Sequence, residues 1–147
     1  MSWAGFGSLG PNLWISPNVD REGEAQQLLD DLGLAATTLS FRGQFASIGS
    51  ETGLVEQAWN LGDVAARYQH FLTEFADMRP EPGVETMLAQ VQLVHEWRRF
   101  PFLDPQLPPE LLPPDWIGAR AASVFHRQHK AWHAGAQAQW RRLASHE

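Results

Sequence analysis

Three histidines near the C-terminus are spaced so that they share one face of a helix. His126, His129 and His133 follow the spacing i, i+3 and i+7, which keeps them within about 80° of one another around the helix axis. Imidazole binds zinc, but three ligands on one straight helix seldom converge on a single ion, and the chain has no cysteine. We therefore expect no metal. Imidazole also titrates near neutral pH, so this face is a candidate for acid–base chemistry, a polar surface stripe or an interface.

A second group of reactive side chains lies in the stretch HEWRRF, which begins at His95. If the chain is an enzyme, His95 and Glu96 are candidate acid–base groups together with His129 and His133. No nucleotide-binding, zinc-protease or serine-hydrolase motif accompanies them. These four residues are thus the catalytic candidates that the sequence offers.

Two adjacent arginines follow in the same stretch. Arg98 and Arg99 point about 100° apart at a helix end, so one can pair with an acid such as Asp104 or Asp115 while the other faces a cleft. A guanidinium group binds carboxylates and phosphates through two parallel hydrogen bonds, which suits an anion clamp. Cations at a helix C-terminus also interact favourably with the helix dipole, so a structural role remains open.

Six of the ten prolines lie between His95 and Trp116. Proline restricts φ and reduces the entropy lost on ordering, so this segment can pack as a rigid strap. The alternative is that the strap forms one wall of a ligand pocket, rimmed by Trp97 and Trp116. The candidate ligand-binding residues are Trp97, Arg98, Arg99, Asp104, Trp116, His126, His129 and Trp132. If the strap is only structural, we expect the site among Trp14, Arg42 and Tyr68.

The elements that must position these residues follow from periodicity and turn signals. Alternation predicts strands at about 12–17 and 36–46, and a short helix begins near Asp20 and ends at Gly33. Helical spacing predicts helices over about 60–75, 82–100 and 115–143, the last capped by Asp115. The expected buried stripe of the middle one is Val84, Met87, Leu88, Val91 and Val94. Strands followed by helices indicate an α+β fold.

Charge is unevenly distributed along the 147 residues, whose net charge is −6. Residues 1–90 have a net charge of −8, whereas residues 91–147 have a net charge of +2. Because phosphate contacts dominate nucleic-acid binding, the acidic first part argues against direct binding to DNA or RNA. The sequence has no signal peptide, no apolar run long enough to span a membrane and no disulfide, so we expect a cytoplasmic protein.

The segment EWRRFPFLDPQLPPELLPPDWIGARAASVF resembles the C-terminal domain of the PaaX family, repressors of phenylacetate degradation. Its most specific motif is Asp-Pro-x-Leu-Pro-x-x-Leu-Leu-Pro-x-x-Trp, from Asp104 to Trp116. AWNLGDVAARYQHFLTEFADM resembles the segment just upstream, and WAGFGSLGPNLWISP resembles part of the family's middle domain. The resemblance implies a truncated ferredoxin-like (Cas2-like), β-rich region over residues 1–48 and a helical PaaX-type domain over 49–147.

The same resemblance implies a function. It suggests an effector-binding and dimerisation module whose ligand is an aromatic small molecule, possibly an acyl-CoA, with no cofactor. The family's winged-helix domain has no counterpart here, so the chain resembles either a fragment of a regulator or a stand-alone descendant. An incomplete sheet leaves unpaired edges, which favours a homodimer. The alternative is a small-molecule enzyme recruited from this family, and a third reading is a pure protein-interaction module.

Overall fold

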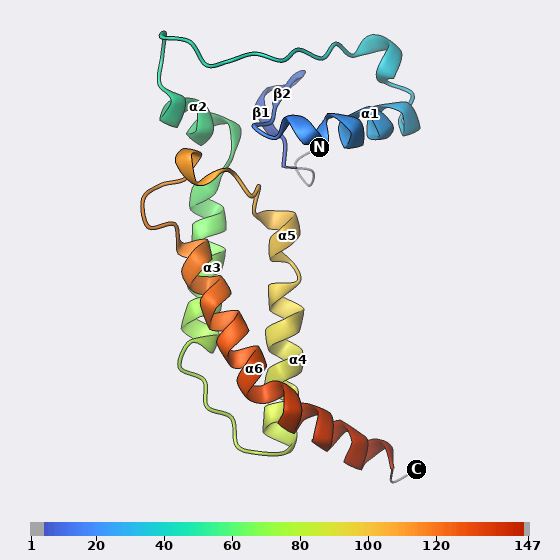
Figure 1. The fold of residues 1–147 in the computed structure, drawn as a ribbon, viewed down its shortest axis with the longest axis vertical. Helices are drawn as coiled ribbons and strands as arrows, with labels where there is room; N and C mark the ends of the chain where they lie inside the picture. The colour runs from blue at the N-terminus through green and yellow to red at the C-terminus, as the bar shows by residue number, and fades with distance from the viewer. Residues whose placement is uncertain (1–4, 146–147) are drawn as a thin grey trace. The chain divides into compact units, whose positions relative to one another are not determined.

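The computed structural model describes residues 5–145, which divide into two compact units. One unit comprises Met1–Leu61 and Pro101–Pro113, and the other comprises Gly62–Phe100 and Pro114–Glu147. The strands are β1 (Gly7–Gly10) and β2 (Leu13–Ile15), and the α-helices are α1 (Glu22–Asp31), α2 (Glu51–Ala58), α3 (Leu61–Phe75), α4 (Val84–Trp97), α5 (Phe100–Leu103) and α6 (Ile117–Ala144). Figure 1 shows the order of these elements along the chain. The fold is mainly helical with one two-stranded sheet, so the predicted α+β class is confirmed.

The first unit is built on a β-hairpin. β1 pairs antiparallel with β2, with Ser8 opposite Trp14 and an irregularity between Ser8 and Gly10. The sequence predicted β2 but not β1. The indole of Trp59, just after α2, packs so closely on Gly7 that a Cβ there would lie 2.6 Å from the ring, and its Nε1 donates to the Gly5 carbonyl at 3.3 Å. Gly7 is therefore the residue that allows the hairpin to approach α2.

The strand predicted at about 36–46 is absent. Ala35–Thr37 forms a short 3₁₀ turn, and the chain then runs without regular structure to α2, which was not predicted and whose N-cap Ser50 accepts a hydrogen bond from the Gly53 amide at 3.2 Å. Among the described residues, no backbone hydrogen bond involves residues 39–49. Leu39 and Phe41 are 82% and 87% exposed. The alternation of apolar and polar residues is present, but no neighbouring strand pairs with it.

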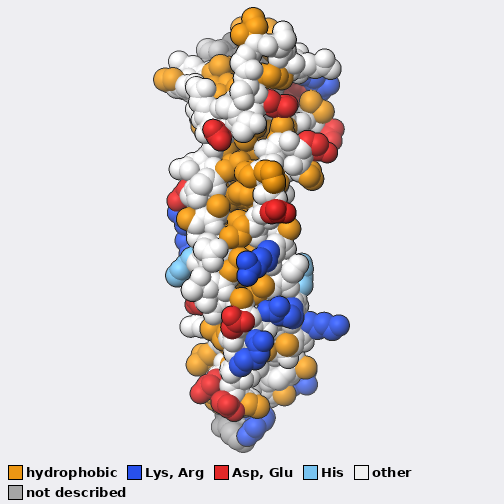
Figure 2. Space-filling model, turned by 90° about the vertical axis from the view of Figure 1, so that its left-hand side faces the viewer, with side chains coloured by type: hydrophobic (Ala, Val, Ile, Leu, Met, Phe, Trp, Pro, Cys, Tyr) orange, Lys and Arg blue, Asp and Glu red, His pale blue; other side chains and the backbone are white. Residues whose placement is uncertain are grey.

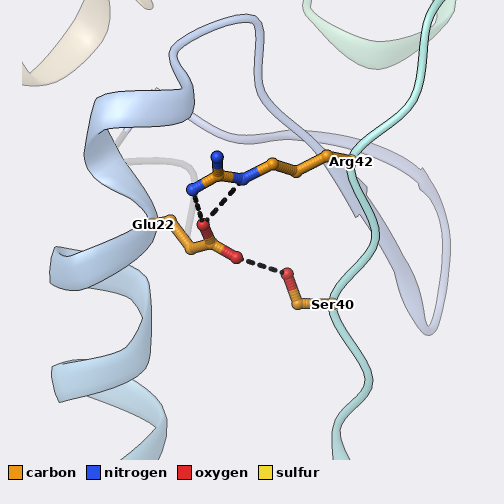
Figure 3. Close-up of polar contacts among 3 residues, drawn as sticks. All are labelled: Glu22, Ser40 and Arg42. Carbon is orange, nitrogen blue, oxygen red and sulfur yellow. Dashed lines mark hydrogen bonds and ion pairs between the residues drawn. The ribbon is translucent and has the colours of Figure 1, made fainter.

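Polar side chains of this extended segment bind the first residue of α1, Glu22 (Figure 3). The Glu22 carboxylate accepts hydrogen bonds from Arg42 Nε at 3.0 Å, from Arg42 Nη2 and from the Ser40 hydroxyl at 3.0 Å. The hydrogen bonds from Arg42, followed by that from Ser40, hold the pKa of Glu22 below its usual value. The same contact raises the pKa of Arg42.

The proline-rich strap belongs to the first unit. Pro105 and Leu107 are buried, and the 3₁₀ turn Pro109–Leu111 contacts α2. Asp104 Oδ1 accepts a hydrogen bond at 2.7 Å from the amide of Gln106, whose φ of 53° lies in the left-handed region. A Cβ at Gly5 would lie 3.2 Å from the Pro105 carbonyl oxygen. The strap thus packs as a structural part of this unit.

The second unit is a three-helix arrangement of α3, α4 and α6. α4 and α6 are in extensive contact, and the core is apolar and strongly aromatic. Its buried members are Val64, Tyr68, Phe71, Leu72, Phe75, Ala89, Leu93, Phe100, Ala121, Val124 and Trp132. Helical spacing correctly predicted these three helices, because apolar residues recur at helical spacing along each of them.

Two details of the helical unit differ from the expectations. The residues of α4 that enter the core are Thr86, Ala89, Gln90 and Leu93, whereas Val84, Leu88, Val91 and Val94 of the predicted stripe are exposed. Asp115 does not cap α6: the N-cap is Trp116, without a side-chain hydrogen bond, and Asp115 has a φ of 54° in the preceding turn. The helix itself was predicted correctly, but its buried face was not, because α4 has apolar residues on two faces.

Candidate functional site

A row of neighbouring rings runs from the end of α4 along α6. The indole of Trp97 stacks on the ring of Phe125, and the imidazole of His129 lies next to Phe125, with centroids 5.5 Å apart. His133 stacks on His129 at 5.1 Å with an angle of 22° between the rings. Phe125, His129 and His133 are successive positions on α6, spaced by four residues, which places their side chains on one face. We call Trp97, Phe125, His129 and His133 the aromatic row.

Trp97 also joins this row to the core of the unit. Its ring centroid lies 5.3 Å from those of Phe71 and Phe100 and 6.4 Å from that of Tyr68. Tyr68 stacks on Phe100 at 4.2 Å, and Trp116 meets Tyr68 edge to face at 6.2 Å. The half-buried Trp97 and Trp116 therefore border the same buried tyrosine.

The adjacent arginines Arg98 and Arg99 have different environments. Arg99 pairs with Glu96 at 3.2 Å, so its partner is neither Asp104 nor Asp115. Arg98 is exposed, and among the described residues no hydrogen bond or ion pair engages its side chain. Of the two guanidinium groups, that of Arg98 is the one available to an incoming anion.

The remaining candidate residues are spread over the unit. Trp132 is 6% exposed and belongs to the core, so it offers no open wall to a ligand. His126 is exposed and touches Phe125 edge to face at 5.4 Å. His95 is exposed on α4, and no hydrogen bond or ring contact between described residues joins it to Glu96, His129 or His133. Among the described residues, the catalytic candidates that the structure brings into contact are His129 and His133, through their stacked rings.

One polar residue with a clear role was missed in the sequence. Gln128 is 3% exposed, and its Nε2 donates to the carbonyls of Phe75 at 2.6 Å, Met78 at 3.3 Å and Ala76 at 3.4 Å. Arg127 Nη2 donates to the Ala76 carbonyl at 2.7 Å. The last carbonyls of a helix have no partner within it, so these side chains satisfy the C-terminal end of α3. The signal available in the sequence was a glutamine within the apolar stripe of α6.

α6 is also the most basic element. It carries Arg120, Arg127, Lys130, Arg141 and Arg142 and contains no Asp or Glu. Figure 2 shows basic side chains gathered on the displayed face of the helical unit. No group of three potential metal ligands exists among residues 5–145. Within the same residues, no helix combines the length and apolar character that a bilayer span requires.

Comparison with known proteins gives the class to which this α+β chain belongs. Residues 59–142 match the family described as PaaX-like protein C-terminal domain. This match spans more than half of the chain and includes α3, α4 and α6. The chain therefore belongs to the PaaX family.

The similarity of this chain to two known proteins extends beyond residues 59–142. The chain is 35% identical over 133 residues to the Transcriptional repressor PaaX of Escherichia coli (strain K12), covering 83% of this chain and 42% of the relative. The uncharacterized protein Rv0674 from Mycobacterium tuberculosis shares the fold, with a TM-score of 0.61 and 24% identity over 95% of this chain and 53% of that one. The chain thus spans about half the length of the proteins it matches.

Proposed function

We propose that the chain is the effector-binding and dimerisation module of a PaaX-like transcriptional regulator and does not bind DNA by itself. The family assignment and the name of the Escherichia coli relative support the regulatory role. The ligand is an aromatic acid or its acyl-CoA thioester. The acidic character of residues 1–90 supports the absence of direct DNA binding.

The environment of Trp97 carries the effector-binding part of the proposal. Its half-buried indole stacks on Phe125, and the His129 ring lies next to Phe125 at an angle of 41°, so aromatic side chains line this part of the helical unit. The next residue, Arg98, has a guanidinium group with no partner among the described residues. An aromatic side chain and an unpaired cation on consecutive residues suit a ligand that has one aromatic ring and one anionic group.

The division of the chain forms a further part of the proposal. Residues 1–48 belong to a ferredoxin-like region, and residues 49–147 are the PaaX-type helical domain. The β1–β2 hairpin followed by α1 supports this reading of the first region. The second assignment is supported by the family match over residues 59–142.

Titration calorimetry of the full chain with phenylacetate, and separately with its coenzyme A thioester, tests the proposal. Arg98→Gln removes the unpaired charge and should weaken binding by roughly 2–3 kcal/mol, about 30- to 150-fold in Kd. Arg99→Gln is the matched control, because Arg99 already pairs with Glu96, and its effect should be smaller.

Tryptophan fluorescence gives a second readout, because Trp97 should be quenched by an aromatic ligand stacked nearby. The proposal fails if neither compound binds, or if both arginine variants retain full affinity. In the latter case Arg98 and Arg99 are not part of a ligand site. Circular dichroism of each variant checks that the helical unit remains folded.

A further inference from the structure

Two histidines on α6 contact each other through their rings across one helical turn. His129 and His133 are four residues apart, and their ring centroids are separated by 5.1 Å with an angle of 22° between the rings. His133 is exposed and His129 is half-buried. Among the described residues, no hydrogen bond or ion pair engages either imidazole. The ring nitrogens of both residues are therefore available to a ligand that binds them together.

We propose that His129 and His133 chelate one divalent transition-metal ion, with water in its remaining coordination positions. Two histidines four residues apart on one helix face are the arrangement that binds zinc in helical metalloprotease sites. A Zn–N distance of about 2.0–2.1 Å and a tetrahedral angle at the metal place two ring centroids about 5.2 Å apart. The observed separation of 5.1 Å matches this value, so shared coordination requires the rings to reorient and not the helix to change.

This pair is a different ligand set from the three histidines for which the sequence predicted no metal. The third histidine, His126, contacts Phe125 edge to face, and no ring contact between described residues joins it to His129 or His133. Three ligands on one straight helix do not converge easily, whereas residues at i and i+4 are neighbours on the helix surface. His126 therefore lies outside the proposed site and is a matched control on the same helix.

The chemistry of the two ligands determines the class of ion. Imidazole suits Zn²⁺, Ni²⁺ and Cu²⁺, whereas Mg²⁺ and Ca²⁺ prefer oxygen ligands. α6 contains no Asp or Glu that could supply a carboxylate. We therefore expect Cu²⁺ to bind more tightly than Zn²⁺, and Mg²⁺ not to bind. Because the site needs only α6, it is independent of the effector-binding role proposed above.

Calorimetric titration of the untagged full chain with nickel chloride tests the site. The pH should be about 7.5, because a metal binds the neutral form of imidazole. We expect one Ni²⁺ per chain. His133→Ala should weaken binding by roughly tenfold or more, because the second ligand of a chelate binds as an intramolecular group. His129→Ala should have the same effect, and His126→Ala should bind Ni²⁺ as the wild type does.

Thermal unfolding followed by circular dichroism gives a second readout. A metal that bridges two turns of α6 binds the folded chain more tightly than the unfolded one, so Ni²⁺ should raise Tm. EDTA should reverse the increase, and Mg²⁺ at the same concentration should not produce it. The same spectra check that each variant is folded. If His129→Ala unfolds because this residue is half-buried, the exposed His133 still provides the test.

The outcomes decide for or against the site. Absence of Ni²⁺ binding, or binding without an increase in Tm, overturns the proposal. Wild-type affinity in His133→Ala overturns it as well, and so does an equal loss of affinity in His126→Ala. Binding that is lost in His133→Ala, retained in His126→Ala and reversed by EDTA supports a chelate formed by His129 and His133.

Discussion

The rings of Trp97 and Phe125 lie almost parallel, at an angle of 8° and with centroids 4.7 Å apart. Trp97 is the last residue of α4, and Phe125 lies in the third turn of α6, so this stack joins two helices far apart in the sequence. Stacked aromatic pairs contribute beyond their burial of apolar area. The stack is therefore both a structural joint and the central part of the candidate ligand surface.

Replacement of Trp97 by Ala should lower the free energy of unfolding by about 3 kcal/mol, because it removes ring contacts with Phe71 of α3 and Phe125 of α6. Chemical denaturation followed by circular dichroism measures the change. Trp140→Ala is the control: its side chain is 63% exposed, and the change should be within about 0.5 kcal/mol. Equal destabilisation by both variants would contradict the structural role of the stack.

Replacement of Gln128 by Leu should destabilise the fold by about 1–3 kcal/mol, because the carbonyls at the end of α3 lose their donor. Urea unfolding is the suitable measurement. Gln137→Leu on the same helix serves as the control, since Gln137 is exposed and should be nearly neutral. A Gln128→Leu variant as stable as the wild type would show that water or Arg127 can replace the amide.

The contact between Glu22 and Arg42 should depend on pH. The pKa of Glu22 is lower in the folded chain, so the contact contributes stability above the ordinary glutamate pKa of about 4.5 and loses it as pH falls through the lowered value. Titration of the Glu22 side chain by NMR should give a midpoint below 4.5.

In the Arg42→Gln variant the midpoint of Glu22 should return toward its ordinary value. The segment that contains Ser40 should also be cleaved faster in limited proteolysis at neutral pH. A Glu22 midpoint that is the same in the wild type and in Arg42→Gln would refute the contact. Because the three side chains are largely exposed, we expect a local change rather than global unfolding.

The chain should show no sequence-specific binding to duplex DNA at physiological salt. Its basic residues concentrate on α6, which permits only a weak, salt-sensitive attraction to phosphate. A gel-shift series from low to physiological salt checks this, with random duplex as competitor. Sub-micromolar binding that survives the competitor would refute the prediction.

Periodicity predicted the helices that have one long apolar stripe. It failed where the structure of a segment depends on contacts with residues far away in the sequence. α3 and α6 follow from helical spacing alone. The alternation at Leu39 and Phe41 describes the two faces of an extended segment, yet it contains no information on whether a second strand lies beside it. For α4, spacing identified an apolar face through Val91 but could not tell it from the face through Leu93 that enters the core.

The candidate site was predictable in part for a similar reason. The sequence grouped Trp97 with Arg98 and His129, and the structure places the rings of Trp97 and His129 next to Phe125. That one arginine pairs internally was expected, whereas its partner Glu96 was not. Trp132 and Gln128 had to be seen in three dimensions, because their burial depends on the packing of α6 against its neighbours.

The hydrogen bonds from Gln128 to the end of α3 limit how α6 can move. A displacement of α6 along its own axis by one turn, about 5.4 Å, would separate the amide from all of its acceptors at once. A small rotation about Gln128 would preserve them while moving the two ends of this 28-residue helix in opposite directions. Gln128 therefore fixes the position of α6 along its own axis relative to the end of α3.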